Sequence, residues 1–361
     1  MTTLDTTETA WTDDRKAISI SFILITALLA LALASLCFGL TTMPPADIWA
    51  TLMGDPPDVN SERILPLRWH RLIVGVGVGI CLALSGAILQ AILRNPLVEP
   101  GVIGLNSGAA LAAAVVLVLT TGAVSNASLA TAAILGATLA VALVTARAWS
   151  PGSLQPMRLI LAGIAVASLA GALLTAAMLA GSPQRLPRLL VWLSGDLNGV
   201  AAKDAHLVWG ALAGALPLVA FVARRLDIAM LDPVSGAGLG HRQRVVTYAL
   251  LGLAAALAGI ATAVCGIVVF VGLVAPHLAR RLTGPMNRRV LPAAALIGAL
   301  IVASADLFGR TVAPPTQLPA GLICGLIGAP FFFLLMRRHH GSPAHQRPPH
   351  RPRHPPRGPT V

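Results

Sequence analysis

Charged side chains are scarce in this sequence: Asp, Glu, Lys and Arg together make up 11% of its 361 residues. A typical soluble domain carries about 25%, so these charges are too few to cover a water-exposed surface. The apolar runs also reach the roughly 20 residues that a helix needs to cross a bilayer. A soluble helical protein is therefore excluded, and the sequence predicts an all-α membrane protein.

Aromatic residues are also few, at 4%, and the apolar mass is mainly Ala, Leu, Val, Ile and Gly. Small residues let membrane helices approach closely, which matters because lipid gives no hydrophobic drive for helix association. Gly75, Gly77 and Gly79 alternate within one apolar run. We interpret them as a close-packing stripe on a helix, since they do not lie between a strand and a helix as dinucleotide binding requires.

Cysteine is rare, and none of the four cysteines has a partner at the spacing of a zinc site. Each lies singly inside an apolar stretch, so we expect small buried hydrophobes. The residues are Cys37, Cys81, Cys265 and Cys324. His277 likewise has no second His, Cys or carboxylate at ligand spacing. The sequence predicts no bound metal and no cofactor on this chain.

A nucleotide-hydrolysing motif is missing as well. A P-loop needs Gly-Lys followed by Ser or Thr, and no Gly-Lys pair occurs anywhere in the chain. No cluster of His, Asp, Ser or Cys gathers on one predicted membrane face. We therefore predict no catalytic residues and a transport subunit rather than an enzyme, with any ATP hydrolysis on a separate partner chain.

The net charge is +12, but the basic residues form short clusters between apolar runs. They make no basic face with interleaved aromatics, so nucleic-acid binding is not indicated. Positive clusters beside membrane spans instead mark cytoplasmic loops.

Arginine placement predicts the number of crossings, because an apolar block with basic clusters at both ends must cross an even number of times. The first span is expected at 18–40 and the second at 70–92, separated by Thr41–Pro66 as an interfacial loop. Four later blocks each cross twice, with fold-backs near Cys265–Gly266 and Arg310–Pro315 in the last two. The prediction is a ten-span domain over residues 18–338, with both termini cytoplasmic.

Residues outside that domain are polar. Residues 1–17 are predicted to be a cytoplasmic N-terminal segment, and residues 339–361 a disordered basic tail rich in Pro, His and Arg. Such a tail cannot bury enough apolar surface to offset the entropy of ordering it.

Polar residues and prolines interrupt the chain after the second predicted span. Gln90, Asn95 and Glu99 are costly at membrane depth, and Pro96 and Pro100 break the helix. Irregular backbone within a membrane needs protein or a water-filled cavity around it. Two interpretations stay open: these residues form a pathway or hinge, or they form a cytoplasmic hairpin with Glu99 in water.

Three arginines break the positive-inside pattern, because the predicted topology places Arg68, Arg71 and Arg310 at the outer face. They can be ordinary interface anchors whose heads reach water. They can also be a docking site for an acidic extracellular partner.

Several motifs resemble the FecCD-type permease family of iron–siderophore, haem and cobalamin ABC importers. In chain order they are Ser85-Gly86-Ala87 with Gln90, Arg94–Gly101, Phe270–His277 with Arg280, Ala305-Asp306 with Arg310, Leu318-Pro319, and Gly328–Phe331. The resemblance implies the type II importer architecture, with ten helices per subunit. It also implies a second permease subunit, identical or homologous, a cytoplasmic ATPase that binds ATP, and an extracytoplasmic binding protein.

The resemblance also implies residue roles. Arg68, Arg71 and Arg310 match positions that dock the binding protein. The segment Leu231–Arg242 matches the contact with the ATPase; its expected coupling residues are Leu231, Leu239, Gly240, His241 and Arg242.

Three departures from the family pattern concern these regions: Trp69-His70 before the second docking arginine, Gln317 in place of the usual Glu, and Asp232-Pro233 in the coupling loop.

The expected function is that of a permease in the bacterial cytoplasmic membrane that moves a ferric siderophore from a binding protein into the cytoplasm. Cobalamin or haem import by the same family is an alternative. A different class, an ion-coupled secondary transporter, also uses broken helices with ionisable residues, and Arg94–Gly101 is compatible with it.

Overall fold

The computed structural model describes residues 4–120, 124–148, 156–230 and 243–339. Every regular element in these ranges is a helix, as predicted. The elements are α1 (Leu4–Cys37), α2 (Pro45–Leu52), α3 (Val59–Leu93), the 3₁₀ helix η1 (Pro100–Ile103), α4 (Leu105–Leu119), α5 (Asn126–Ala148), α6 (Pro156–Ala180), α7 (Leu186–Leu193), α8 (Ala202–Met230), α10 (Gln243–Cys265), α11 (Val271–Thr283), α12 (Asn287–Thr311) and α13 (Ala320–His339).

Seven of the described helices are long and apolar enough to cross a membrane: α1, α3, α5, α6, α8, α10 and α12. α4 and α13 are shorter apolar helices, and α11 has 13 residues. Each predicted crossing coincides with one of these helices, whereas the count of ten membrane-spanning helices stays a prediction. The fold-backs after Cys265 and Thr311 lie where the arginine pattern placed them.

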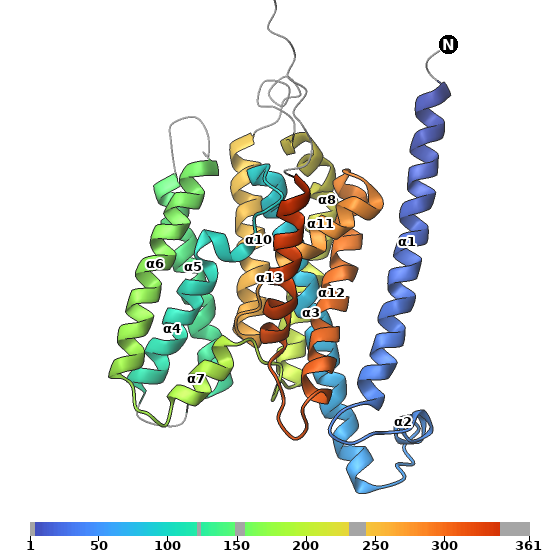
Figure 1. Cartoon of the computed structure of the whole chain (residues 1–361), viewed down its shortest axis with the longest axis vertical. Coiled ribbons are helices and arrows are strands. Elements are labelled where there is room, and N and C mark those ends of the chain that lie inside the picture. The colour runs from blue at the N-terminus through green and yellow to red at the C-terminus, as the bar shows by residue number, and fades with distance from the viewer. Residues whose placement is uncertain (1–3, 121–123, 149–155, 231–242, 340–361) are drawn as a thin grey trace, which may run out of the picture.

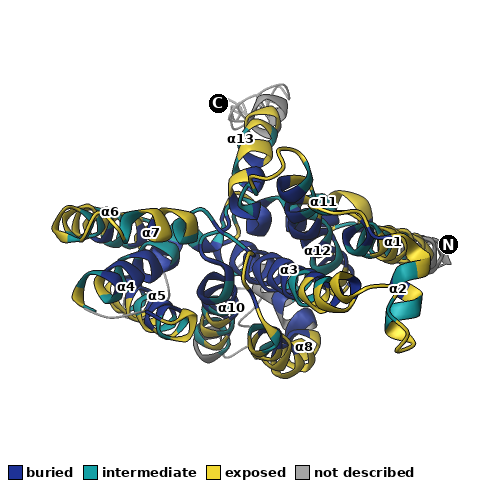
Figure 2. Ribbon diagram, turned by 90° about the horizontal axis from the view of Figure 1, so that it is seen from below, coloured by how far each residue is buried: buried dark blue, intermediate teal, exposed yellow. Residues whose placement is uncertain are grey.

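The helices form two groups, and α3 lies at the centre of the larger one (Figure 2). Of its most apolar window, 83% is buried, and it packs against α8, α10, α11 and α12. The glycine stripe explains this closeness: a Cβ on Gly79 would overlap the carbonyl oxygen of Gly298 on α12, and one on Gly77 would collide with Val208 on α8. The prediction of a close-packing stripe is confirmed.

A second group contains α4, α5, α6 and α7 (Figure 1). Gly108 of α4 and Gly136 of α5 face each other so closely that a Cβ on either would meet the other's backbone. Helix α10 packs on both α3 and α5, and this contact joins the two groups.

The two ends of the bundle hold different parts of the chain (Figure 1). The beginning of α1 and the end of α13 lie at the same end of the bundle, which we call the terminal end. α2, α7 and the connection between α12 and α13 lie at the opposite end, which we call the α2 end. This arrangement agrees with an even number of crossings between the described ends.

The expectation that Thr41–Pro66 is an interfacial loop is wrong, because this segment contains α2 and the start of α3. The Asp58 side chain accepts a hydrogen bond from Ser61 N at 2.6 Å and caps α3. Pro66 lies inside the helix. Arg68 and Arg71 therefore stand one turn apart on α3, on the same side of the helix.

Candidate functional site

The three predicted docking arginines meet in one cavity at the α2 end, with a volume of about 440 Å³. Its walls come from α3, from α12, and from the connections that follow α1, α7 and α12. We call it the arginine cavity. It is lined by Gly39, Leu40, Thr41, Ile64, Leu67, Arg68, Arg71, Leu197, Asn198, Gly199, Val200, Arg310 and Gln317.

Arg68 is buried and holds the end of α1. Its Nη1 donates to the carbonyl oxygens of Leu36, at 2.6 Å, and Cys37, at 3.1 Å. Its Nη2 donates to the backbone and side-chain oxygens of Thr41. The last carbonyls of a helix lack intrahelical partners, so this guanidinium satisfies them and complements the helix dipole.

Arg71 and Arg310 share one acidic partner, Asp306. Arg71 Nε donates to Asp306 Oδ1 at 2.7 Å, and its Nη1 donates to Gln317 Oε1 at 2.6 Å. Arg310 Nε lies 3.6 Å from Asp306 Oδ2, one turn along α12. Arg310 Nη2 donates to the carbonyl oxygen of Ser35 at 2.6 Å, so α1, α3 and α12 are joined here.

Two guanidinium nitrogens at this cavity keep donor capacity. Among the described residues, Arg71 Nη2 and Arg310 Nε have no hydrogen-bond acceptor although both atoms are buried. Three guanidinium groups line the cavity, and Asp306 pairs with only two of them, so this site carries net positive charge. Guanidinium groups bind carboxylates through strong charge-assisted hydrogen bonds. The arrangement therefore suits recognition of an anionic group, and whether it docks a protein stays a prediction.

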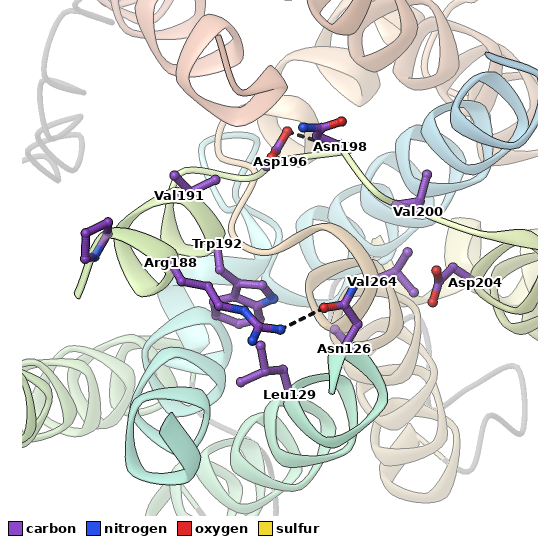
Figure 3. A pocket seen from close by; sticks show the side chains of 12 residues that line it. Asn126, Leu129, Arg188, Val191, Trp192, Asp196, Asn198, Val200, Asp204 and Val264 are labelled. Atoms are coloured by element: carbon purple, nitrogen blue, oxygen red, sulfur yellow. Dashed lines mark hydrogen bonds between the residues drawn. The ribbon is translucent and has the colours of Figure 1, made fainter. Parts of the chain in front are cut away.

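A second cavity of about 340 Å³ lies beside the first and shares Asn198 and Val200 with it. Figure 3 shows Arg188 of α7 pointing toward Asn126, to which its Nη2 donates at 3.0 Å. The polar groups of this cavity also include Asp204, which accepts from the backbone ahead of α8. These polar side chains thus serve local structure at the starts of α5 and α8.

The predicted pathway or hinge residues fall into two groups. Gln90 is buried on α3 and its Nε2 donates to the carbonyl oxygens of Val98, at 3.2 Å, and Gly272, at 3.4 Å. Pro100 is buried and packs against Gly272 of α11. These contacts fasten the connection between α3 and α4 to the start of α11.

Glu99 completes this junction. Its Oε2 accepts a hydrogen bond from Phe270 N at 2.9 Å, at the beginning of α11. Burial raises the pKa of the Glu99 carboxyl above its ordinary value, and the hydrogen bond from Phe270 opposes that rise. A carboxylate at a helix N-terminus interacts favourably with the helix dipole.

Asn95 and Pro96 form the second group and lie toward the surface. Asn95 Oδ1 accepts from Leu97 N at 2.9 Å, which makes a local turn. Whether any of these residues acts as a hinge or lines a pathway stays a prediction.

The expected coupling residues lie outside the described residues. They are Leu231, Leu239, Gly240, His241 and Arg242. The predicted tail, 339–361, lies outside them too, apart from its first residue.

Sequence reasoning missed Asn287 and Asp227, which interact at the terminal end. Asn287 stands shortly before the apolar run that begins at Val290, and Asn is typical of helix starts. Asp227 has a weaker signal, as an isolated acid beside a basic pair.

A bundle in which seven described helices are long and apolar enough to cross a membrane defines a multi-span membrane protein. The chain belongs to the FecCD transport family, whose model matches residues 27–338. The resemblance noted from the sequence motifs is confirmed, and the chain is a transport permease subunit rather than an enzyme.

Two relatives are named as iron-complex permeases. The chain is 36% identical to the achromobactin transport system permease protein of Dickeya dadantii, over 90% of this chain and 92% of the relative. It is 37% identical to the Fe(3+)-citrate import system permease protein of Bacillus subtilis, over 87% and 93%.

A third relative is named for a different solute. The vitamin B12 import system permease protein of Vibrio cholerae is 34% identical, over 89% of this chain and 95% of the relative.

A solved metal-chelate-type ABC transporter in an inward-facing conformation has the same fold. Its TM-score is 0.79 at 28% identity, covering 89% of this chain and 99% of that chain. These similarities do not favour an ion-coupled secondary transporter.

Proposed function

We propose that this chain carries a ferric siderophore, or a related iron complex, across the bacterial cytoplasmic membrane. The observation that supports this most is the similarity at 36% and 37% identity to permeases named for achromobactin and Fe(3+)-citrate. Relatives named for vitamin B12 and hemin are 34% identical, so those solutes are the second candidates.

The proposed complex contains this permease, a second permease subunit, a cytoplasmic ATPase that binds ATP and an extracytoplasmic binding protein. In this proposal the α2 end faces outward and both termini are cytoplasmic. The positive-inside pattern supports this orientation, since Arg288 and Arg289 lie at the terminal end. ATP on the partner then biases the permease between two conformations.

The proposed role of the arginine cavity is to receive carboxylates of the binding protein. Its support is geometric: Arg68, Arg71 and Arg310 line one cavity, and two of them keep buried N–H donors directed at no described acceptor. Such electrostatic docking sets encounter rate and orientation more than affinity.

Uptake assays test this proposal. Cells expressing the permease with its ATPase and binding protein are given radiolabelled ferric siderophore, ferric citrate, hemin or vitamin B12. Accumulation of the ferric siderophore or ferric citrate that stops when the ATPase is inactivated is expected. Accumulation that persists without the ATPase and collapses with a protonophore contradicts the importer. Accumulation of vitamin B12 alone or hemin alone contradicts the assignment of the solute.

A further inference from the structure

A buried amide joins three helices at the terminal end. Asn287, the first residue of α12, is fully buried. Its backbone N and its side-chain Nδ2 both donate to Asp227 Oδ1 of α8, each at 2.8 Å. The start of α12 is thereby held against the last part of α8.

The same amide also contacts α11. Arg280 Nη1 donates to Asn287 Oδ1 at 3.2 Å and to the carbonyl oxygen of Pro285 at 3.4 Å. Asn287 therefore donates to α8 and accepts from α11 at once. An amide does this with two separate atoms, Nδ2 as donor and Oδ1 as acceptor, whereas a carboxylate cannot donate and an aliphatic group can do neither.

The next residues extend the connection to α1. Arg289 is buried, and its Nε lies 2.6 Å from Asp14 Oδ1 on α1. The more exposed Arg288 reaches the other oxygen of Asp14 at 3.2 Å. Four helices thus meet within three consecutive residues of α12.

Helix α12 runs from this cluster to the arginine cavity at the other end of the bundle. It carries Asn287 at its start, and Asp306 and Arg310 in its last turns. Helix α11 begins directly after Phe270, whose N donates to Glu99, and it carries Arg280 in its last turn. α12 therefore connects the terminal end to the cavity, and α11 connects it to the α3–α4 connection.

We propose that Asn287 is a positioning residue for ATP coupling, which locks the ends of α8, α11 and α12 into one moving unit. The inference rests on the proposed function, in which the terminal end faces the cytoplasm and the ATPase. Asp227 lies in the last part of α8 at that end, so a movement of this part of α8 reaches Asn287 through their contact. Without the amide, α8 moves while α11 and α12 do not follow.

The test uses a reciprocal exchange of the two side chains. Asn287→Asp removes the side-chain donor, leaves the backbone N, and places a second carboxylate against Asp227. Combining it with Asp227→Asn restores a donor and an acceptor in swapped positions, and keeps an acceptor for Arg280. Arg288→Gln is the matched control, because it alters the adjacent, exposed residue while Arg289 still holds Asp14.

The complete transporter is reconstituted in proteoliposomes with whichever of ferric citrate, hemin and vitamin B12 the wild type accumulates. Asn287→Asp is expected to lower uptake per ATP hydrolysed at least about fivefold, with hydrolysis itself kept within about twofold. The exchanged double variant should regain nearly the wild-type ratio of uptake to ATP hydrolysis, and Arg288→Gln should keep it. Parallel loss of uptake, hydrolysis and folded protein, or failure of the exchange to restore the ratio, overturns the positioning role.

A solute-free measurement separates this inference from the proposed function. Spin labels on Leu218→Cys in α8 and Leu282→Cys in α11 report whether the two helices move together, and both positions are exposed. The distance should be unchanged by ATP in the wild type and the exchanged variant, and should shift in Asn287→Asp. A distance that ATP leaves unchanged in Asn287→Asp as well, or that ATP already changes in the wild type, contradicts the inference. Absence of uptake by the wild type contradicts only the proposed function.

Discussion

Arg71 of α3, which lines the arginine cavity, donates to Asp306 of α12 across 2.7 Å. The side chains are 11% and 4% exposed, so both charges lie largely out of water. Arg310 approaches the other oxygen of the same carboxylate at 3.6 Å. A single buried acid thus balances two guanidinium groups, and it controls both the stability of this end and the positive charge left for a partner.

Replacing that acid should be costly. Asp306→Asn leaves Arg71 and Arg310 close together without a counter-charge, and losing one partner of a buried ion pair typically costs about 3–5 kcal/mol. We expect a large fall in the unfolding temperature of the detergent-purified permease, measured by fluorescence-detected size exclusion. Asp55→Asn is the control, since Asp55 is exposed at the same end. Equal unfolding temperatures for the two variants contradict the structural role of Asp306.

We expect Arg68 to stabilise the fold through the hydrogen bonds of its guanidinium group, which a positive charge alone does not supply. Arg68→Lys keeps the charge but cannot reach the three acceptor residues that the guanidinium contacts. Each lost hydrogen bond from a charged donor costs about 1.5–3 kcal/mol, so thermal stability should fall. Arg63→Lys, an exposed change on the same helix, should have little effect. Stability that survives Arg68→Lys shows that its contacts with α1 contribute little.

Arg71 is the better residue for testing docking, because its Nη2 is a remaining donor. Arg71→Gln should slow association with the binding protein and weaken the dependence of that rate on ionic strength. Surface plasmon resonance at several salt concentrations measures both quantities. Arg63→Gln removes an equal charge from α3 outside the lining of the cavity. If the two variants change the rate equally, the cavity is not the docking site.

Much of the fold follows from charge placement alone. Arginines at both ends of an apolar block require an even number of crossings, and the structure confirms the resulting turns after Cys265 and Thr311. The grouping of Arg68, Arg71 and Arg310 also follows, since the topology assigns all three to one end. The early start of α3 does not follow from charge placement. Thr41–Pro66 is polar and contains prolines, and only the Asp58 cap signals the helix.

The partners of these residues could not be predicted in the same way. Arg68 binds carbonyl oxygens of α1, and backbone acceptors leave no trace in residue types. Gln317 departs from the family's usual Glu, yet it still accepts from Arg71 at 2.6 Å. Asn287 contacts Asp227 across 60 positions of chain, and such contacts depend on tertiary packing rather than on local spacing.

Helix contact through glycine gives a prediction about packing. Gly79→Ala places a methyl group on the backbone of Gly298, so α3 and α12 must separate, and overpacking of this kind costs about 1–3 kcal/mol. Gly252→Ala is the matched control, because its added Cβ has no described atom within 4 Å apart from its chain neighbours and the backbone of its own helix. In a helix that change is neutral or stabilising by up to about 1 kcal/mol. Thermal unfolding that ranks Gly252→Ala below Gly79→Ala contradicts the close-packed interface.

The burial of the Glu99 carboxyl should make the stability of the fold depend on pH. Burial raises its folded pKa above the ordinary value of 4.5, so between the two pKa values the folded chain binds more protons than the unfolded chain. The free energy of unfolding therefore falls as pH rises through that window. Glu99→Gln keeps an oxygen that accepts from Phe270 N but carries no charge, so its stability should not show this fall.

The comparison needs a variant that loses the acceptor as well. Glu99→Leu leaves Phe270 N unpaired, which costs about 1–3 kcal/mol, and should lower the unfolding temperature at every pH. Unfolding temperatures measured between about pH 4 and pH 8 should place Glu99→Gln increasingly above the wild type as pH rises. Parallel curves for these two proteins would mean that the Glu99 carboxyl titrates as it does in the unfolded chain, and that its burial beside α11 has no electrostatic cost.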